Sequence, residues 1–179
     1  MTITPEIMSK FVKSAASRLS GSWVIIGGSV LQLLNISART TEDIDVAGPQ
    51  TATQADILTL MEISQSLGLP IEAINQAGAF FLHKIQNWEN KLILVHKEQK
   101  ASIYRPNLEL YLRLKIARLS ESDLEDCLRY LDYTILHGEP IDPQSLMRIC
   151  GEPVQSPELT ARRAKLIAAI KTQTKVVGS

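Results

Sequence analysis

The stretch Trp23–Val46, WVIIGGSVLQLLNISARTTEDIDV, decides the fold that we expect for this chain. An apolar run opens it, two glycines and Ser29 follow, and a second apolar run leads to the triplet Asp43-Ile44-Asp45. Glycine lets the backbone approach other backbone or a phosphate where a side chain would clash. Carboxylates at positions i and i+2 of a strand share one face, because side chains alternate with a period of two. A glycine turn followed by such a pair predicts nucleotide chemistry.

This stretch resembles the DNA polymerase beta-like nucleotidyltransferase superfamily, whose signature is a strand, a Gly-Gly or Gly-Ser turn, a helix and a strand that carries Asp-x-Asp. It is most similar to the small bacterial branch related to AbiEii-like toxin nucleotidyltransferases. The second motif of that branch reads Arg-x-Thr-x-Asp-Ile-Asp, and residues 39–45, RTTEDID, fit it at each fixed position. The resemblance implies the minimal nucleotidyltransferase fold and nucleotidyl transfer.

The resemblance implies that Asp43 and Asp45 bind Mg²⁺ or Mn²⁺ and act in catalysis. An in-line phosphoryl displacement gathers charge on oxygen atoms, and a divalent cation neutralises that charge. In the alternative interpretation Asp43 caps a turn and Asp45 makes a local salt bridge. We expect Ile44 and Val46 to point to the opposite, buried face, which favours the metal site.

The resemblance also implies that Gly27, Gly28 and Ser29 hold the β- and γ-phosphates of a nucleotide through their backbone amides and the serine hydroxyl. A helix begins after this turn, and a helix N-terminus favours anions through its unpaired N–H groups and its dipole. Alternatively, packing alone requires a tight strand-to-helix turn. Both interpretations can hold together.

Arg39 and Thr41 precede the carboxylates, and the resemblance places them among the nucleotide-binding residues. An arginine can hold a phosphate through two parallel hydrogen bonds. It can equally pair with Glu42 or Asp43. The sequence leaves both possibilities open.

Lys115 lies within the apolar stripe of a helix that we expect over residues 107–119, three residues after Leu112 and four before Leu119. A buried, unpaired ammonium is costly, so Lys115 either extends to the surface or meets an anion. The toxin-like relatives carry a lysine in this helix that contacts a nucleotide phosphate. That resemblance implies a catalytic role for Lys115.

The fourth motif of those relatives reads Arg-Asp-x-x-Asp-Leu. Residues 122–127, SDLEDC, keep both aspartates but have serine and cysteine in place of arginine and leucine. We expect Asp123 to cap its helix. Asp126 lies on the same helix face. It either belongs to the nucleotide-binding residues or pairs with Lys115 or Arg118.

Many members of the superfamily use a third carboxylate, on a later strand, to activate the incoming hydroxyl. Glu72 and Glu98 are the available carboxylates, and neither lies in a clear strand pattern. His83 and His96 are alternative bases. Without a base, nucleotide binding would persist while transfer would weaken.

Hydrophobic periodicity and turn residues predict the remaining elements. We expect an α/β (α+β) fold with a small mixed sheet flanked by helices over residues 1–105. A helical bundle packs on it over residues 106–179, unless the two form one continuous domain. We predict helices over 5–19, 29–34, 53–67, 107–119, 123–136, 143–150 and 157–171, and strands over 23–26, 43–47, 71–74, 91–96 and 101–104.

The chain has 179 residues, of which 45% are apolar, enough for one sizeable core. No apolar run approaches the roughly 18 to 20 residues of a membrane helix. Cys127 and Cys150 lie far apart without metal-ligand spacing, so we expect two buried thiols. We therefore expect a cytoplasmic protein with no disulfide and no membrane contact.

The formal net charge is zero, so the chain as a whole lacks an electrostatic footprint for nucleic acid. Basic residues gather between His83 and Arg118. This segment can receive a triphosphate or an RNA backbone, or it is a solvated face.

We predict a magnesium-dependent nucleotidyltransferase that transfers a nucleoside monophosphate from an NTP to an RNA or protein hydroxyl. The resemblance implies a role in a toxin–antitoxin pair, with a cognate antitoxin as a partner. Alternatively, the chain is a non-catalytic module of the same fold that binds nucleotide, RNA or protein. The apolar helices can also mediate homodimerisation.

Overall fold

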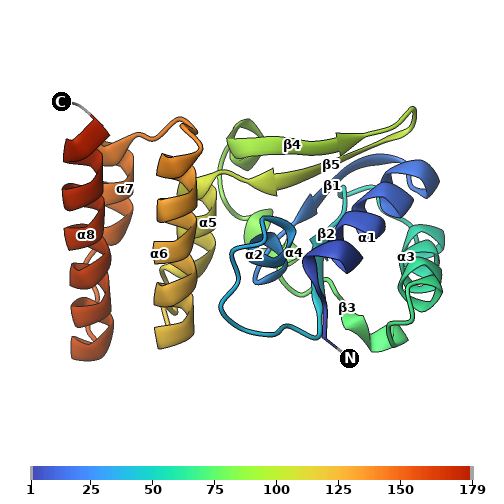
Figure 1. Cartoon of the computed structure of the whole chain (residues 1–179), viewed down its shortest axis with the longest axis horizontal. Helices are drawn as coiled ribbons and strands as arrows, with labels where there is room; N and C mark the ends of the chain where they lie inside the picture. The colour runs from blue at the N-terminus through green and yellow to red at the C-terminus, as the bar shows by residue number, and fades with distance from the viewer. Residues whose placement is uncertain (1, 178–179) are drawn as a thin grey trace. The chain divides into compact units, whose positions relative to one another are not determined.

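The structure is a computed structural model that describes residues 2–177, with side chains for residues 2–174. The chain forms two compact units, and the boundary lies between Pro106 and Asn107 (Figure 1). Unit 1 comprises the residues up to Pro106, and unit 2 comprises those from Asn107. No helix in the described part of the chain is long and apolar enough to cross a membrane.

Unit 1 combines helices with the strands of one sheet, which confirms the predicted α/β class. Its α-helices are α1 (Pro5–Arg18), α2 (Ser29–Leu33), α3 (Gln54–Ser66) and α4 (Ala79–Leu82), and its 3₁₀ helices are η1 (Ile71–Ala73) and η2 (Trp88–Lys91). Its strands are β1 (Gly21–Ile25), β2 (Ile44–Ala47), β3 (Ile74–Asn75), β4 (Leu92–Lys97) and β5 (Ala101–Pro106).

The sheet is small and mixed, as the sequence predicts, with the strand order β3-β2-β1-β5-β4. Strand β1 pairs antiparallel with β2 and parallel with β5, and β4 pairs antiparallel with β5. Strand β3 runs parallel to β2, with Asn75 opposite Asp45. The glycine turn therefore follows the strand that lies next to the one carrying Asp45.

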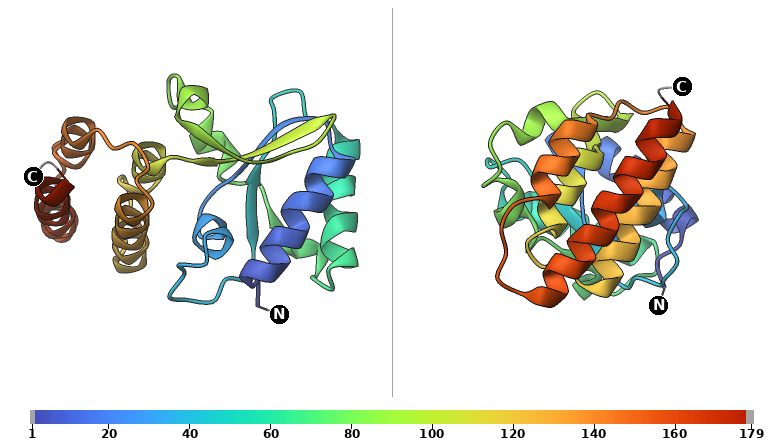
Figure 2. Two further views of the ribbon diagram at one scale, coloured as in Figure 1. Left: turned by 45° about the horizontal axis from the view of Figure 1, so that its top comes forward. Right: turned by 90° about the vertical axis from the view of Figure 1, so that its left-hand side faces the viewer.

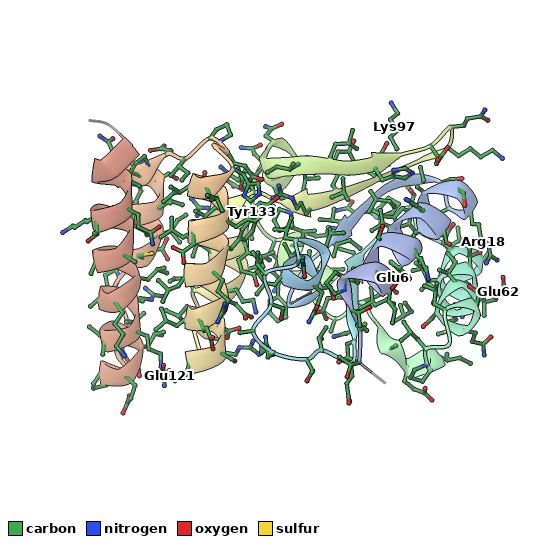
Figure 3. The ribbon with its side chains drawn as sticks, viewed as in Figure 1. Glu6, Arg18, Glu62, Lys97, Glu121 and Tyr133 are labelled. Carbon is green, nitrogen blue, oxygen red and sulfur yellow. The ribbon has the colours of Figure 1, made fainter. Side chains whose placement is uncertain are left out.

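Helix α1 begins where the sequence predicts, because Thr4 caps it and Pro5 occupies its first turn. Its buried face includes Phe11 and Ala15, which lie one turn apart. Helices α1 and α3 pack side by side (Figure 2). Arg18 of α1 and Glu62 of α3 point toward each other and form an ion pair (Figure 3). Both side chains are largely exposed, so this pair adds little stability.

The alternation along β2 separates a buried face from a polar one. Ile44 and Val46 are fully buried in the core, as expected, whereas Asp45 between them is half-buried. Trp23 of β1 is fully buried in the same unit. The core therefore fixes the strand that carries Asp45 and orients its carboxylate away from the apolar face.

The strand predicted over residues 71–74 is wrong. Pro70 leads into the 3₁₀ helix η1, whose turn is closed by the N–H of Ala73 donating to the carbonyl of Pro70 at 3.1 Å. Extended backbone follows only at Ile74 and Asn75, which form the short strand β3. A strand of two residues has no readable period, so hydrophobic alternation cannot reveal it.

Unit 2 is helical, which confirms the predicted C-terminal bundle. Helices α6 and α7 pack against α8, and α5 packs against α6 and α7. Helix α5 ends before the predicted residue 119, where the chain turns and Leu119 has a φ of +32°. Helix α8 extends past the predicted end at Lys171. The bounds are α5 (Leu108–Lys115), α6 (Glu121–Leu136), α7 (Pro143–Cys150) and α8 (Pro157–Val177).

Both cysteines are buried free thiols in the helices of unit 2, as predicted. Burial raises the pKa of Cys150 to about 11, although Arg163 acts in the opposite direction. Burial raises the pKa of Cys127 as well. Thiols with raised pKa values stay protonated at neutral pH and are poor nucleophiles.

Candidate active site

The turn between β1 and α2 brings Gly27 against the carboxylate of Asp45. Gly27 has a φ of +60°, a conformation that residues with a side chain rarely adopt. A Cβ atom at this position would lie 2.2 Å from Oδ2 of Asp45, far inside contact distance. The position therefore requires glycine for two reasons, and one of them is the site carboxylate itself.

The second glycine brings two further site residues together. A Cβ atom at Gly28 would lie 3.6 Å from Nη2 of Arg39 and 3.9 Å from Oγ1 of Thr41. These are ordinary contact distances, so the position has room for a methyl group. The guanidinium and the hydroxyl thus lie beside the same turn that contacts Asp45. The structure brings together the glycines, Arg39, Thr41 and Asp45, all of which the sequence selected.

Ser29 is fully buried, and its hydroxyl joins α2 to β2. It donates a hydrogen bond to the carbonyl of Asp43 at 3.1 Å and accepts one from the N–H of Asp45 at 2.8 Å. A hydroxyl has a single proton to donate, and the oxygens of an ionised phosphate only accept. The phosphate contact that the resemblance implies for this hydroxyl would break its bond to Asp43. In this structure Ser29 positions the carboxylate strand.

The two carboxylates differ in exposure. Asp43 is exposed and directly precedes β2, whereas Asp45 is half-buried within the strand. Oδ1 of Asp45 accepts a hydrogen bond of 2.8 Å from Nδ2 of Asn75. Oδ1 of Asn75 in turn accepts from the N–H of Ala77 at 3.0 Å. Asn75 therefore orients the carboxylate of Asp45.

Asn75 is a site residue that the sequence did not reveal. It lies on the strand next to β2 and faces Asp45, where the resemblance leads one to look for the third carboxylate. An amide oxygen can bind a cation, but an amide does not accept a proton at neutral pH. The only available signal was the expectation of a polar side chain on a later strand.

The four residues considered as a third carboxylate or a base lie in other surroundings. Glu98 pairs with His96 at 3.2 Å, and His96 belongs to β4, three strands from β2 in the sheet. Glu72 lies in η1. Nε2 of His83 is buried without a hydrogen-bond partner among the described residues. None of these four residues lies opposite Asp45 in the sheet. The residue opposite Asp45, on β3, is Asn75.

In unit 2, Lys115 is buried and meets anions from its own unit. Its Nζ lies 2.7 Å from Oδ1 of Asp123 and 3.4 Å from Oδ2 of Asp126. The sequence left two possibilities open for each residue. Lys115 meets anions instead of extending to the surface, and Asp126 pairs with Lys115. A contact between these residues and a nucleotide stays a prediction.

Asp123 is the centre of this ion cluster and is fully buried. Arg118 holds it with two hydrogen bonds, from Nε at 2.8 Å and Nη2 at 2.9 Å. Ser120 donates from both its backbone N–H and its hydroxyl and completes a capping box, which confirms the predicted cap. Burial raises the pKa of Asp123, but the hydrogen bonds from Arg118, Lys115 and Ser120 outweigh it. They hold the pKa well below its usual value of 3.8.

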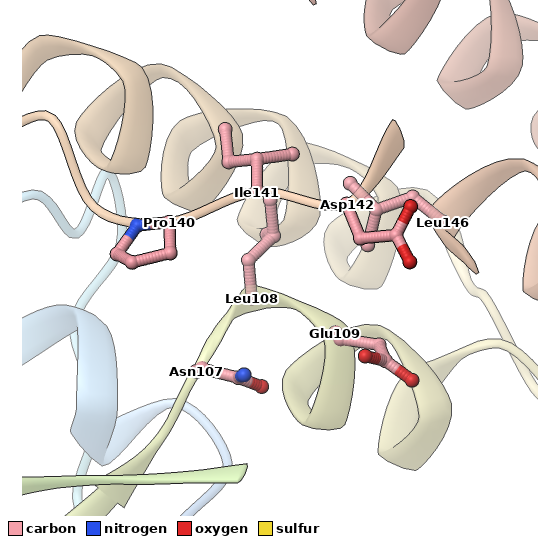
Figure 4. Close-up of a pocket in the computed structure, with 7 residues that line it drawn as sticks. All are labelled: Asn107, Leu108, Glu109, Pro140, Ile141, Asp142 and Leu146. Atoms are coloured by element: carbon pink, nitrogen blue, oxygen red, sulfur yellow. The ribbon is translucent and has the colours of Figure 1, made fainter. Parts of the chain in front are cut away.

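A pocket in unit 2 lies at the N-termini of α5 and α7 (Figure 4). Asn107 and Asp142 cap these helices with their side chains. The carboxylates of Glu109 and Asp142 line the pocket beside apolar residues such as Leu146. Negative charge disfavours a triphosphate. This pocket is therefore a poor candidate for the nucleotide site.

The family model described as "Nucleotidyltransferase of unknown function (DUF6036)" matches residues 2–137. The chain belongs to this nucleotidyltransferase family. The matched range includes the glycine turn, Asp45 and the ion cluster of unit 2. No curated protein and no solved structure matches the chain. The expected superfamily is confirmed, whereas the AbiEii-like branch stays a prediction.

The sequence predicts a cation site at Asp43 and Asp45, and the described residues restrict which groups could form one. No group of three or more His, Cys, Asp or Glu that could hold a metal ion occurs among residues 2–177. Mg²⁺ is commonly bound by one or two carboxylates together with substrate phosphates and waters. The carboxylate of Asp45 lies against the turn at Gly27, and the backbone carbonyl of Asp43 is bonded to Ser29 of the same turn. The oxygen donors of these two aspartates fit the chemistry of Mg²⁺.

Proposed function

We propose that this family member transfers a nucleoside monophosphate from an NTP to a hydroxyl of an RNA or a protein, with Mg²⁺ as cofactor and pyrophosphate as product. The family supports nucleotidyl transfer in general. The observation that carries the proposal is the close approach of Gly27 to Asp45, 2.2 Å from an added Cβ atom to Oδ2. It puts the glycine turn in direct contact with Asp45, which we propose as a cation ligand.

Each candidate site residue of unit 1 has a separate proposed role. Asp43 and Asp45 would hold Mg²⁺, which when bound supplies charge neutralisation at the phosphate oxygens. Asn75 and Ser29 keep the carboxylate strand in place through the hydrogen bonds described above. Arg39 is suited to bind phosphate oxygens, because a guanidinium offers parallel N–H donors. The triphosphate would thus lie over the turn at Gly28.

The acceptor and the partner are the finer parts of the proposal. The motif at residues 39–45 supports membership in the toxin-like branch, and we extend the proposal to a cytoplasmic toxin with a cognate antitoxin. In such a pair, the antitoxin would suppress labelling by the chain when both are present. Self-association stays a prediction, which analytical ultracentrifugation of the full chain tests.

A second candidate function is a module that binds nucleotide or RNA without transfer. Two observations favour it. Asn75 provides an amide where the resemblance leads one to expect a carboxylate, so no base is provided at that position. Lys115 and Asp126, which the resemblance assigns to the nucleotide, bind each other.

Labelling with radioactive NTPs separates the two functions. The full chain is incubated with each α-labelled NTP, Mg²⁺ and total RNA, and compared with the Asp43→Ala/Asp45→Ala double variant. We expect label in RNA or protein for the parent chain and a loss of about 10³-fold or more in the variant, since the cation ligands are removed. Glu62→Gln, a surface change far from β2 in sequence, is the matched control.

Calorimetry on the same samples measures binding and distinguishes binding without transfer from transfer. Magnesium-dependent NTP binding without label in any acceptor supports the binding module. Equal labelling by the parent chain and the double variant removes the enzyme proposal. Absence of labelling, together with absence of binding to both NTP and RNA, removes both candidate functions.

A further inference from the structure

We propose that Phe80 and Phe81 of α4, together with Lys84, form a platform on which a base of a single-stranded RNA acceptor stacks. We call these three residues the aromatic platform. The inference rests on the proposed function, since it names the acceptor class of the same site. Four observations support it: the exposure of the two rings, their mutual geometry, the charge of residues 76–88, and the contacts of the residues before α4 with Asp45 and Ile26.

The two phenylalanines are unusually exposed for their size. Phe80 is 61% exposed and Phe81 is 60% exposed, although they are neighbours on one short helix. Their rings lie edge to face, 5.5 Å between centroids and with an interplanar angle of 82°. The next residue, Leu82, is fully buried and anchors α4 to the core. Adjacent exposed rings on an anchored helix mark an interaction surface.

The helix that carries the rings is attached to the candidate active site at two points. Asn75, three residues before Gly78, donates to Oδ1 of Asp45 at 2.8 Å. Gly78 precedes α4 and packs on Ile26, because a Cβ atom there would lie 2.4 Å from the Cδ1 atom of that side chain. Ile26 directly precedes the glycine turn. The residues that lead into α4 therefore contact Asp45 of β2 and Ile26, which directly follows β1.

The charge of the segment favours a nucleic acid over a protein or a lipid tail. Nζ of Lys84 lies 3.8 Å from the centroid of the Phe80 ring, which is a cation–π contact. Residues 76–88 contain Lys84 and His83 and no acidic side chain. An aromatic face with an adjacent cation matches one nucleotide unit, a base and its phosphate.

The same geometry distinguishes the acceptor strand from the NTP. The phosphates of the NTP are assigned to the turn at Gly28, where Arg39 supplies a cation. Lys84 is a second cation, beside the rings, and a bound NTP has no further phosphate for it. The platform therefore suits a nucleotide of a separate strand. Because every base has an apolar face, stacking here would be tolerant of base identity.

The test measures binding of a fluorescently labelled, single-stranded RNA of mixed sequence to the full chain by anisotropy, and binding of NTP by calorimetry. We expect Phe80→Leu/Phe81→Leu to weaken RNA binding about tenfold, since leucine keeps the apolar surface but loses the stacking face. NTP affinity should be unchanged. The Phe80→Tyr/Phe81→Tyr variant, which keeps both aromatic faces, should bind RNA like the parent chain. The control is Leu136→Ala, which changes an exposed apolar residue of α6.

Lys84→Gln gives an independent readout. Loss of one phosphate contact should lower the slope of log affinity against log salt concentration by about 0.7, the value for a single strand. An unchanged slope, together with unchanged RNA affinity in the leucine variant, overturns the platform. Retained RNA affinity with weakened NTP binding also overturns it, because the stacked base would then belong to the NTP.

The outcome is separable from that of the proposed function. If the chain labels no acceptor but the leucine variant weakens RNA binding, the platform stands and the transfer activity fails. If labelling needs Asp45 but the leucine variant binds RNA like the parent chain, the platform fails and the activity stands. Leucine variants that bind RNA normally but lose self-association would show that the rings pack against a second copy, which also overturns the proposal.

Discussion

Two pairs of aspartates in this chain have opposite surroundings. Asp123 and Asp126 in unit 2 are buried and meet Lys115, and Asp123 also meets Arg118. On the carboxylate strand of unit 1, Asp43 is exposed. Asp45 is half-buried, lies against the turn at Gly27 and accepts a hydrogen bond from Asn75. A fully buried carboxylate such as Asp123, bonded to cations of its own unit, contributes to the fold, whereas a carboxylate that is partly open to solvent can reach an external ligand. The comparison separates a structural pair from the pair that we propose as cation ligands.

The largest effect that this comparison predicts comes from a single methyl group. Gly27→Ala places a Cβ atom on Oδ2 of Asp45 and forces a positive φ on alanine, so Asp45 must move. We expect nucleotidyl transfer to fall about 100-fold or more, in the range seen when one preorganised polar contact is lost. The measurement is the rate of labelling with α-labelled NTP.

Gly138→Ala is the matched control for that experiment. Gly138 of unit 2 also has a positive φ, of +64°, but an added Cβ atom there would meet nothing within 4 Å. We expect labelling to stay within a few-fold of the parent chain. If the two alanine variants lose activity equally, the contact between Gly27 and Asp45 is not what limits transfer.

The next effect is on stability and belongs to unit 2. Asp123→Asn removes the buried charge that holds Lys115 and Arg118. Breaking one partner of a buried ion pair costs up to about 3–5 kcal/mol when the other charge stays buried and unpaired. Here Lys115 keeps Asp126 at 3.4 Å and Arg118 is 75% exposed, so the loss should lie near the lower end, about 3 kcal/mol. We expect a loss of this size in the free energy of unfolding, measured by urea denaturation. Asp43→Asn, at an exposed position, should change that free energy by less than about 0.5 kcal/mol.

A smaller loss is expected at the serine that joins α2 to β2. Ser29→Ala leaves the N–H of Asp45 without its bond to the hydroxyl, whereas the carbonyl of Asp43 keeps a hydrogen bond from Oγ1 of Thr41 at 3.3 Å. An unsatisfied buried group costs about 1–3 kcal/mol. Labelling should fall together with the midpoint of urea unfolding. Reduced NTP affinity with unchanged stability would instead favour a direct phosphate contact.

The smallest effect is the acid dependence of stability. The folded pKa of Asp123 is held below its unfolded value, so the stabilisation by this group is complete above that unfolded value of about 3.9 and is lost as the pH falls below it. We expect the free energy of unfolding to decline from about pH 4 downward, in part through this residue. The Asp123→Asn chain should show a shallower decline. Parallel curves for the two chains would contradict this assignment.

The sequence selected those residues of the candidate site whose pattern depends on neighbours along the chain. Strand alternation selected Asp43 and Asp45, of which the structure places Asp45 in β2 and Asp43 just before it, and the glycine turn was selected by its place after an apolar run. Asn75 was missed, because its role depends on pairing with a strand thirty residues earlier and its own strand is too short to show a period. The bond from Ser29 to β2 likewise joins distant segments, so no local pattern encodes it.

Unit 2 illustrates the same limit in a different form. The apolar stripe of α5 indicated that Lys115 either extends to the surface or meets an anion, and periodicity cannot choose between these or between a ligand and a carboxylate of a neighbouring helix. The structure supplies Asp123, from α6. The strand predicted over residues 71–74 was wrong for another reason. Pro70 starts a 3₁₀ turn, which an apolar run does not reveal.

The contact between Gly27 and Asp45 ties the fates of two positions in the gene. While the carboxylate occupies this place, a side chain at position 27 would collide with it, so we expect selection to retain a glycine codon wherever the carboxylate is needed. Should a descendant lose its need for the carboxylate and replace it by a smaller residue, the steric part of that constraint would end. Paired changes at these two positions would then mark a lineage that no longer needs the carboxylate, even where the fold is unchanged.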